Sequence, residues 1–378
     1  MMRKTKIICS IGTRPEAIKM APVIIRLKQE AWCQVFVLGT AQHREMLDQT
    51  LSFFNIGLDG DLNVMEKDQS LTDLTHRLLT KLDGFIRTES PDLMLAQGDT
   101  TTTFLTALGA FYHRVPFGHI EAGLRTHNKF FPYPEEMNRA LTARLADFHF
   151  APTQEAKKNL LQEGILETRI WVTGNTVIDA LFLVDGRKTE LPFGRRPSSK
   201  LVLVTAHRRE NFGQPFLEVC KALRELIQVF PDIEIVYPVH PNPHIHGVAH
   251  RELKGFDRIT LLPPLDYGPF VATMRASCLI LTDSGGIQEE ATILGIPVLL
   301  LRDETERPEA VDAGIVKVVG PRADAILKQA SPFLSGGDCR KAAISSSPYG
   351  DGKAAVRIAS ILKEKFIGEG ITSGPSRF

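Results

Sequence analysis

The sequence predicts an α/β protein of two doubly wound domains, each built on a parallel sheet, that face each other across a cleft. Short β-branched or aliphatic runs alternate with longer amphipathic segments along the whole chain, which is typical of parallel strands joined by crossover helices. The chain of 378 residues also exceeds the size at which one hydrophobic core usually stops growing. A polar stretch without periodicity, at residues 186–200, interrupts the alternation and predicts the linker between the domains.

The composition argues against several classes of partner. Hydrophobic residues make up 43% and charged residues 24%, as in ordinary globular proteins, and the formal net charge is +1. This balance gives no overall field that would attract nucleic acid or a membrane surface, so an anionic ligand must be bound by local geometry. The first apolar run, residues 7–11, is too short for a signal segment, and no run approaches the length of a membrane span.

The five cysteines are odd in number and lie far apart, mostly inside apolar runs. This distribution predicts buried thiols in a reducing compartment rather than a disulfide framework or a zinc site. We therefore expect a cytoplasmic protein. The cysteines are Cys9, Cys33, Cys220, Cys278 and Cys339.

The elements of the first domain, residues 1–185, follow from the spacing of their apolar residues. Its strands are predicted at 6–11, 34–38, 93–96, 117–120 and 148–151. Its helices are predicted at 16–29, 43–54, 71–86, 134–145 and 175–184. Pro15 takes the first position of the first helix, and Ser70 with Asp73 forms a start signal for the third.

The second domain, residues 186–352, repeats the alternation of strands and helices. Its strands are predicted at 201–205, 234–239, 259–262, 279–282, 298–301 and 316–319, with a helix at 216–230. A last amphipathic helix follows at 353–366, and its periodicity alone does not say which domain it covers. In doubly wound sheets ligands bind beyond the carboxyl ends of the strands, so we expect the chemistry in the loops that follow them.

One such loop has the form of a phosphate cradle. In LILTDSGGIQEE, residues 279–290, an apolar run stops at paired glycines and restarts as a helix, which leaves N–H groups free to bind phosphate oxygens. Ser284, Gly285 and Gly286 are the candidates, since a backbone without Cβ lets an anion come close. Glu290 lies one turn beyond and could accept hydrogen bonds from a hydroxylated group such as a ribose. Taken alone, the stretch also fits an ordinary strand-to-helix turn.

Charged residues follow several strands of the first domain. Arg14 and Lys19 come after the first strand, Asp99 follows another in QGDTTTT, and Glu121 follows a third in HIEAGLRT. Glu135 ends the loop after Glu121. Because the carboxyl ends of parallel strands lie at one edge of a sheet, we expect the three carboxylates to converge, as general acid and base chemistry requires. Singly, each carboxylate could instead be a helix cap or part of a surface ion pair.

Histidines and an arginine follow strands of the second domain. His207 follows the first strand in TAHRREN, and His240 follows the second in YPVHPNP. Arg307, in RDETERPE, would add a bidentate contact to an anion near the predicted cradle.

Motifs for cofactors and metals are missing. The sequence has no GxGxxG after the first strand, no GxxxxGK[ST], no HExxH and no paired CxxC, so neither a nicotinamide cofactor nor an ATP-binding loop is predicted. The histidines between His240 and His250 resemble a metal cluster, but no carboxylate or cysteine completes a usual ligand set. Asp59, Gly60 and Asp61 resemble a metal-binding DxD, yet a polar loop explains them better. We expect no cofactor and no metal.

The ordered set of motifs closely resembles the bacterial non-hydrolysing UDP-N-acetylglucosamine 2-epimerases. The motifs are GTRPEAIKMAP, TAQHREMLDQ, QGDTTTT, HIEAGLRT, PYPEEMNR, GNTVIDAL, TAHRREN, YPVHPNP, LTDSGGIQEEA and TERPEAVDAG. The resemblance covers the chain from about residue 6 to about residue 365. It implies two Rossmann-like domains arranged as in GT-B glycosyltransferases, with the C-terminal helix, within residues 353–378, packed back on the first domain. It also implies a homodimer.

The resemblance implies that the protein interconverts UDP-GlcNAc and UDP-ManNAc, supplying ManNAc for surface polysaccharide. Members of the family eliminate UDP to give 2-acetamidoglucal and then add it back on the other face. Asp99, Glu121 and Glu135 match carboxylates assigned to acid and base work, and His207 matches a histidine near the UDP phosphates. The positions that match substrate contacts are Arg14, Lys19, Ser284, Gly285, Gly286, Glu290 and Arg307. Phe270 matches an aromatic residue beside the uracil, and Leu265 stands where some relatives have Gln.

The resemblance also raises the prospect of regulation. Several bacterial members are activated by UDP-GlcNAc bound beside the catalytic site, and Gln42, Arg209 and His240 match positions associated with that second site. Glu45 and Asp68 stand where some regulated relatives have neutral or basic residues, and acidic groups would repel a diphosphate. Arg209 and His240 could instead form a hinge pair that orders the closed cleft.

Three other functions remain open from the sequence. A GT-B-type glycosyltransferase would share the UDP cradle but would not need three carboxylates. A hydrolysing epimerase would release free ManNAc and UDP. A nucleotide-sugar sensor would bind its ligand without turnover. The sequence does not say which carboxylate is the base and which is the acid.

Overall fold

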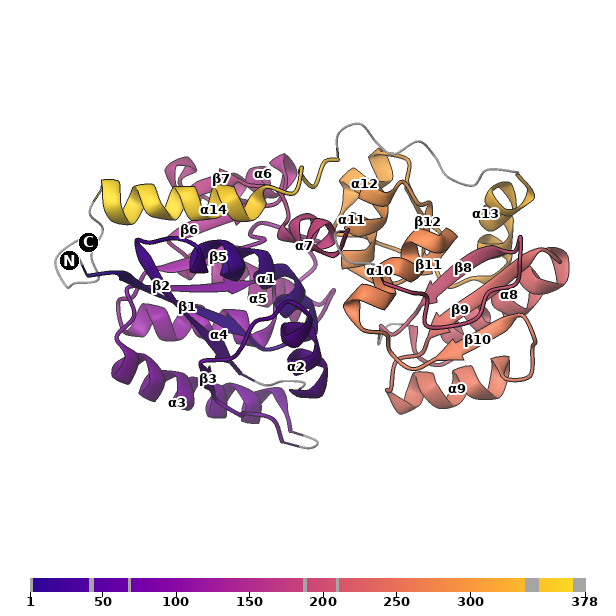
Figure 1. Cartoon of the computed structure of the whole chain (residues 1–378), viewed down its shortest axis with the longest axis horizontal. Coiled ribbons are helices and arrows are strands. Elements are labelled where there is room, and N and C mark those ends of the chain that lie inside the picture. Colours follow the sequence, from indigo (N-terminus) through magenta and orange to yellow (C-terminus); the bar gives the residue numbers. More distant parts are fainter. Residues whose placement is uncertain are drawn as a thin grey trace. The chain divides into compact units, whose positions relative to one another are not determined.

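The computed structural model describes residues 3–40, 44–66, 69–185, 189–208, 211–336 and 347–369. The chain divides into two compact units, which we call unit 1 (Met1–Leu183 and Tyr349–Phe378) and unit 2 (Val184–Pro348). Figure 1 traces both along the sequence. Among the described residues, no helix is long and apolar enough to cross a membrane.

Unit 1 is a parallel sheet whose strand order is β3-β2-β1-β4-β5-β6-β7. Its strands are β1 (Thr5–Ile11), β2 (Cys33–Gly39), β3 (Gly60–Asp61), β4 (Leu93–Gln97), β5 (Phe117–Ile120), β6 (Phe148–Ala151) and β7 (Ile170–Val172). Its helices are α1 (Arg14–Lys28), α2 (Arg44–Phe53), α3 (Leu71–Glu89), α4 (Thr101–Tyr112), α5 (Glu135–Leu145), α6 (Gln154–Gln162) and α7 (Thr176–Asp185), with a 3₁₀ turn η1 (Glu167–Arg169) before β7. The order reverses between β1 and β4, so the loops after these two strands lie at the switch point where such sheets bind ligands.

Unit 2 is a second parallel sheet, with the order β10-β9-β8-β11-β12-β13. Its strands are β8 (Lys200–Thr205), β9 (Ile233–Pro238), β10 (Ile259–Leu262), β11 (Ser277–Thr282), β12 (Val298–Leu300) and β13 (Val316–Val318). Its helices are α8 (Gln214–Val229), α9 (Pro243–Leu253), α10 (Tyr267–Ala276), α11 (Gly285–Leu294), α12 (Pro308–Asp312) and α13 (Ala323–Ser335). Here the switch point lies between β8 and β11, and the loops after these strands carry His207 and the glycine pair.

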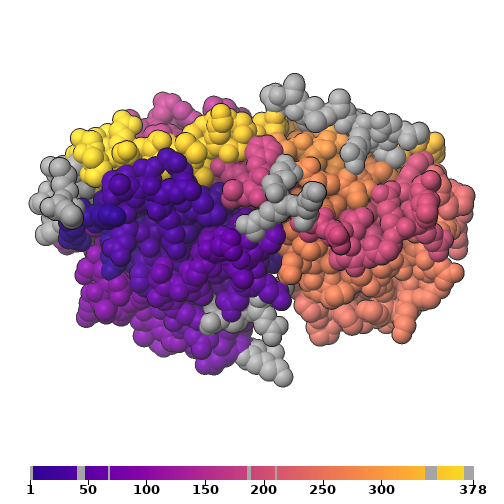
Figure 2. Space-filling model, viewed as in Figure 1, coloured from indigo at the N-terminus to yellow at the C-terminus, as the bar shows by residue number. Residues whose placement is uncertain are grey.

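The C-terminal helix belongs to unit 1. Helix α14 (Ala354–Lys363), followed by a π-helical turn η3 (Glu364–Gly368), packs against α1. Figure 2 shows this yellow segment at the surface beside the indigo start of the chain. The predicted fold class, two Rossmann-like sheets with the last helix returned to the first, is therefore confirmed.

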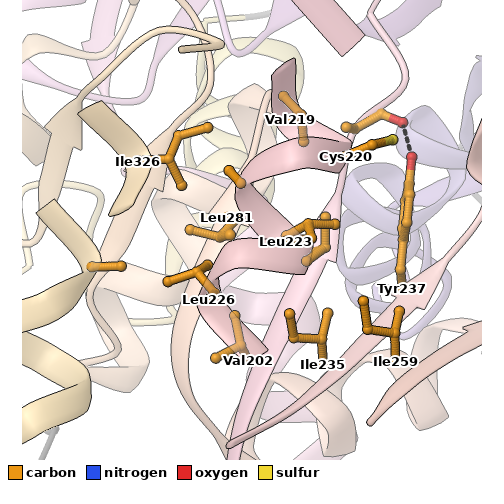
Figure 3. Packing of buried hydrophobic residues seen from close by; sticks show 14 of the residues in the cluster. Val202, Val219, Cys220, Leu223, Leu226, Ile235, Tyr237, Ile259, Leu281 and Ile326 are labelled. Carbon is orange, nitrogen blue, oxygen red and sulfur yellow. Dashed lines mark hydrogen bonds between the residues drawn. The ribbon is translucent and has the colours of Figure 1, made fainter. Parts of the chain in front are cut away.

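Apolar side chains from strands and helices form a separate core in each unit. In unit 2, α8 and α13 cover one face of the sheet, and Figure 3 shows Leu223 and Leu226 of α8 beside Val202 and Ile235 of the strands beneath. The Tyr237 hydroxyl lies at the edge of this core and donates to the Ala206 carbonyl at 2.7 Å (Figure 3). The core thereby holds the backbone immediately before His207.

Two short strands were missed by the sequence prediction. Gly60 and Asp61 were expected in a loop, but they pair in parallel with Leu38 and Gly39 as the edge strand β3. Strand β7 has only three residues, Ile170–Val172, too few to show alternation.

The described cysteines are free thiols. Cys9, Cys33 and Cys220 are buried, as predicted, whereas Cys278 is partly exposed. Burial raises the pKa of Cys33 to about 11 and the pKa of Cys220 to about 12, so both thiols are protonated at neutral pH. Cys339 lies outside the described residues.

Candidate active site

The loop between β1 and α1 is closed by a capping box. Thr13 precedes α1, and its hydroxyl accepts a hydrogen bond from the Glu16 N–H at 3.4 Å. The Glu16 carboxylate in turn accepts from the N–H groups of Gly12 at 2.9 Å and Thr13 at 2.6 Å. Arg14 is thus presented at the start of α1 on a fixed backbone.

Glu16 also reaches the neighbouring loop. Its second oxygen accepts from the hydroxyls of Thr100 at 2.5 Å and Thr103 at 3.2 Å, on the turn that follows Asp99. Burial raises the Glu16 pKa, although the donors from Thr100 and Gly12 oppose that shift. One buried side chain therefore joins the loops at the switch point.

Glu121 stands at the end of β5 in a buried cluster of donors. The Lys19 ammonium lies 2.5 Å from Glu121 Oε1, and the Asn175 side-chain amide donates to the same oxygen at 2.8 Å. The Gln97 side-chain amide donates to Oε2. The structure therefore brings together Lys19 and Glu121, which the sequence singled out separately.

Arg139 on α5 joins Asp99 to the start of that helix. Its Nε donates to Asp99 Oδ2 at 2.9 Å, and its Nη1 donates to Glu136 Oε2 at 2.7 Å. Asn138 donates to the Asp99 carbonyl at 2.9 Å. Glu135 is the first residue of α5, so this network fixes the helix end that carries it relative to Asp99.

His119 stabilises the loop after β4, which carries Asp99, through a hydrogen bond to its backbone. Its Nε2 lies 2.7 Å from the Gly98 carbonyl oxygen and therefore donates to it. Burial lowers the His119 pKa to about 3, so the ring is neutral and serves as a donor rather than as a charge. The bond fixes Gly98, whose φ of +84° turns the chain just before Asp99.

In unit 2, Asp283 orients His207. Asp283 is fully buried after β11, and its Oδ2 accepts from the N–H groups of His207 and Arg208, each at 2.8 Å, and from the Asn211 amide at 3.1 Å. Its Oδ1 lies 3.2 Å from His207 Nδ1. Burial alone would raise the Asp283 pKa, but attraction to His207 and these donors outweighs it and lowers the pKa to about 2.

His240 packs on His207. The two rings stack with centroids 5.5 Å apart and an angle of 14° between their planes. The Asn242 N–H donates to His240 Nδ1 at 3.1 Å. The other two residues expected at a second site, Gln42 and Arg209, lie outside the described residues, as does Asp68, and the side chain of Glu45 is not described.

The glycine pair opens α11 as predicted, with Ser284 as the residue before the helix. A Cβ placed on Gly285 would overlap the Arg307 guanidinium and the Glu306 carboxylate, whereas a Cβ on Gly286 would meet nothing within 4 Å. A side chain at 285 would therefore displace Arg307 and Glu306, and this reason for glycine differs from the expected approach of an anion. Gly286 offers the open backbone that an anion could approach.

Arg307 lies at the cradle, among carboxylates. Its Nε donates to Glu289 Oε1 at 2.6 Å and its Nη1 to Glu306 Oε1 at 2.5 Å. These two partners fix the plane of the guanidinium beside Gly285.

Glu290 is joined to the start of α10. The Tyr267 hydroxyl donates to Glu290 Oε1 at 2.7 Å. Leu265 is buried just before α10, and Phe270 is partly buried within it. This hydrogen bond therefore joins Glu290, which is expected to contact the ribose, to the segment 265–270, which is expected to contact the uracil.

Several residues of the site escaped sequence reasoning. Asp283 lies between the apolar run and Ser284, and its place at a strand end could have marked it. Gln97 at the end of β4, Asn175 just before α7 and Arg139 within α5 carry no such signal, because an amide or an arginine is recognised only through its partner.

No metal cluster is present in the described part of the chain, where no group of three or more His, Cys, Asp or Glu side chains is placed to hold an ion. The histidines of α9 have separate neighbours: His246 packs on His250 with ring centroids 4.4 Å apart, and His244 packs on Phe212.

Known proteins resemble this chain in both sequence and structure. A sequence model of a family described as UDP-N-acetylglucosamine 2-epimerase matches residues 25–363. The "Probable UDP-N-acetylglucosamine 2-epimerase" of Ralstonia nicotianae is 49% identical over 372 residues, 96% of this chain and 99% of the relative. The UDP-N-acetylglucosamine 2-epimerase of Escherichia coli K12 is 48% identical over 374 residues, with coverage of 96% and 99%. The UDP-GlcNAc 2-epimerase of Neisseria meningitidis, solved bound to UDP-GlcNAc, matches with a TM-score of 0.91 at 45% identity, over 95% of this chain and 100% of that one.

Proposed function

Because the chain belongs to the UDP-N-acetylglucosamine 2-epimerase family, we propose that it is an isomerase that interconverts UDP-GlcNAc and UDP-ManNAc by inverting C2 of the sugar. The observation that carries this proposal within the site is Glu121, a buried carboxylate at a strand end held by Lys19, Gln97 and Asn175. A group held from several sides is preorganised for proton transfer.

The proposed reaction passes through elimination and re-addition. The C2 proton is not acidified by a carbonyl on an adjacent ring carbon, so a base removes it as the C1–O bond breaks and UDP leaves with the electron pair. The product of this step is 2-acetamidoglucal. UDP then attacks C1 again while an acid returns a proton to the opposite face of C2. Asp99, Glu121 and Glu135 are the proposed acid and base groups, and no redox cofactor takes part.

The proposed binding groups for UDP lie mainly in unit 2. The N–H groups at Ser284, Gly285 and Gly286 would stabilise the diphosphate as its charge develops, an effect that preorganised donors supply best. Arg307 would add positive charge there, and His207 would lie beside the phosphates. Glu290 would accept from the ribose, with Phe270 and Leu265 beside the uracil. In unit 1, Arg14 and Lys19 are the proposed substrate contacts.

Product analysis tests the activity. Pure protein is incubated with UDP-GlcNAc and the mixture is followed by NMR. We expect an equilibrium of UDP-GlcNAc and UDP-ManNAc. Free ManNAc with UDP would instead indicate a hydrolysing epimerase, transfer to an added acceptor would indicate a glycosyltransferase, and unchanged substrate with tight binding would indicate a sensor. Any of these three results contradicts the proposal.

We also propose a homodimer. Large apolar side chains are exposed on α4, on α5 and in the loop before α5: Phe111, Tyr112, Met137, Leu141, Phe130 and Tyr133. Exposed apolar groups gathered on neighbouring helices are typical of a subunit interface. Phe111→Lys should shift the mass measured by light scattering toward the monomer, whereas Leu166→Lys, at an exposed position elsewhere on unit 1, should leave the mass unchanged.

We further propose that UDP-GlcNAc bound at a second site, with Gln42, Arg209 and His240, activates the reaction. The stacking of His240 on His207 supports this proposal, because an effector that binds His240 would touch a residue packed on a proposed UDP contact. The buried free cysteines support the proposal of a cytoplasmic location.

A further inference from the structure

Two segments of unit 1 that are distant in sequence touch at the place where the chain leaves that unit and returns to it. The chain departs after Leu183 and re-enters at Tyr349. The Asn175 N–H donates to the Tyr349 carbonyl at 2.7 Å. A Cβ on Gly174 would lie 3.3 Å from the Gly350 Cα, and a Cβ on Gly350 would lie 3.1 Å from the Gly174 Cα, so the two backbones are in direct contact.

The departing helix also holds the returning one. Asp179 on α7 accepts hydrogen bonds from the first N–H groups of α14, those of Ala354 at 3.2 Å and Ala355 at 2.9 Å. A carboxylate at this helix end supplies the cap that Lys353 does not provide. Two sets of hydrogen bonds therefore hold the two segments together, one between Asn175 and Tyr349 and one between Asp179 and the start of α14. We call this contact the crossing.

The side chain of Asn175 turns from this crossing into the candidate site. It is 2% exposed, and its Oδ1 accepts from the Val177 N–H at 3.1 Å. Its Nδ2 donates to Glu121 Oε1 at 2.8 Å. A single residue thus contacts the returning chain with its backbone and the proposed catalytic carboxylate with its side chain.

Glu121 needs such support because its backbone has a φ of +65°, a region that residues other than glycine seldom adopt. Lys19 reaches it from α1 and Gln97 from β4, while Asn175 reaches it from the crossing. Removal of one donor leaves an oxygen of a buried carboxylate less well satisfied and the carboxylate less firmly positioned.

We propose that Asn175 is a positioning residue for Glu121, and that it makes the placement of this carboxylate depend on how Tyr349 and Gly350 rejoin unit 1. The inference rests on the proposed function, because it takes Glu121 as a residue that handles the C2 proton. Asn175 acts in this proposal through its hydrogen bond to Glu121.

Two substitutions at Asn175 separate its roles. Serine can still accept from the Val177 N–H, as capping residues do, but it is too short to reach Glu121. Aspartate also keeps the acceptor and places a second carboxylate against Glu121. We expect Asn175→Ser to lower kcat by about 10- to 100-fold, the usual cost of a small misplacement of a catalytic group. KM should stay within about threefold of wild type by the same argument, and Asn175→Asp should lower kcat further.

The decisive measurement is the kinetic isotope effect with C2-deuterated UDP-GlcNAc and UDP-ManNAc. A residue that only stabilises the fold would leave this isotope effect unchanged when it is replaced. An isotope effect does not depend on the fraction of active protein. We expect the isotope effect to rise in Asn175→Ser for the substrate from which Glu121 removes the C2 proton. Gly350→Ala, which touches neither Glu121 nor substrate but would press on Gly174, should give the same change.

The matched control is Thr153→Ala. Thr153 caps α6 by accepting from the Ala156 N–H at 3.1 Å, so its loss should lower the melting temperature and leave the isotope effect at the wild-type value. If Glu121→Gln lowers kcat while Asn175→Ser and Gly350→Ala leave both kcat and the isotope effects unchanged, this inference is wrong and the proposed function stands. If Glu121→Gln itself retains the wild-type rate, the proposed role of Glu121 fails and the inference fails with it.

Discussion

At the scale of single residues, the candidate site is made of charged groups that are positioned by ion pairs and hydrogen bonds with their neighbours. Lys19 and Glu121 form an ion pair that is almost fully buried, and further hydrogen bonds are needed for such a pair to be tolerated. Asp99 is held by Arg139, and His207 by Asp283. The sequence identified both members of the first pair but missed Arg139 and Asp283. Arg139 lies within a helix, where no local pattern marks it as a partner of Asp99, whereas Asp283 could have been recognised from its place at a strand end.

The proposed acid and base residues can be tested one by one. Asp99→Asn, Glu121→Gln and Glu135→Gln each keep the size of the side chain and remove its ability to take up or release a proton. We expect each to lower kcat by about two to four orders of magnitude, the usual contribution of a positioned acid or base. Steady-state rates with UDP-GlcNAc provide the measurement, and near-normal rates in all three variants would contradict the assignment.

Asp283 gives a prediction about acid stability. Its pKa is about 2 in the folded protein, below the ordinary value of 3.8, so the ionised form stabilises the fold above about pH 4. That stabilisation, about 2 kcal/mol, is lost as the pH falls through the folded pKa.

We therefore expect Asp283→Asn to be less stable than wild type at pH 6 and the gap to close as the pH approaches 2. Urea unfolding followed by circular dichroism across this range measures the gap. A gap that stays constant with pH would show that the charge of Asp283 contributes nothing to the fold.

At the scale of elements, most strands were predictable, including the three-residue β12 and β13, whereas β3 and β7 were not. Strands such as β1 and β8 were found because both faces of a central parallel strand are buried, which makes the whole run apolar. The two-residue β3 lies at the sheet edge, where pairing with β2 depends on contacts that no local pattern reveals. Likewise, the Asp-Ser-Gly-Gly turn predicted the helix start but not the guanidinium packed against Gly285.

The two glycines at the start of α11 should respond differently to alanine. In Gly285→Ala the new methyl group collides with Arg307 and Glu306, so we expect a loss of about 1–3 kcal/mol of stability and a higher KM. In Gly286→Ala the methyl group meets no protein atom, and alanine favours the helix by about 0.5–1 kcal/mol. There we expect a higher KM without any loss of stability, because the methyl group shields N–H groups proposed to bind phosphate. Equal KM values for Gly286→Ala and wild type would argue against the cradle.

At the scale of the whole molecule, the proposed property is regulation, because the residues proposed for the second site come from both units. If UDP-GlcNAc acts as an effector, its binding must favour the active arrangement of the protein over the inactive one. We expect pure UDP-ManNAc to react with a lag or hardly at all, and a trace of UDP-GlcNAc to abolish the lag. Progress curves that begin at the full rate and ignore added UDP-GlcNAc would remove the regulatory proposal and leave the epimerase assignment intact.

The central claim is that C2 is inverted by loss and return of its proton during elimination of UDP, and solvent labelling tests it most directly. UDP-GlcNAc is converted by the pure protein in deuterated water, and the product is analysed by NMR and mass spectrometry. The account predicts UDP-ManNAc with deuterium at C2, together with traces of 2-acetamidoglucal and UDP. UDP-ManNAc that forms with its original proton still at C2 would contradict it.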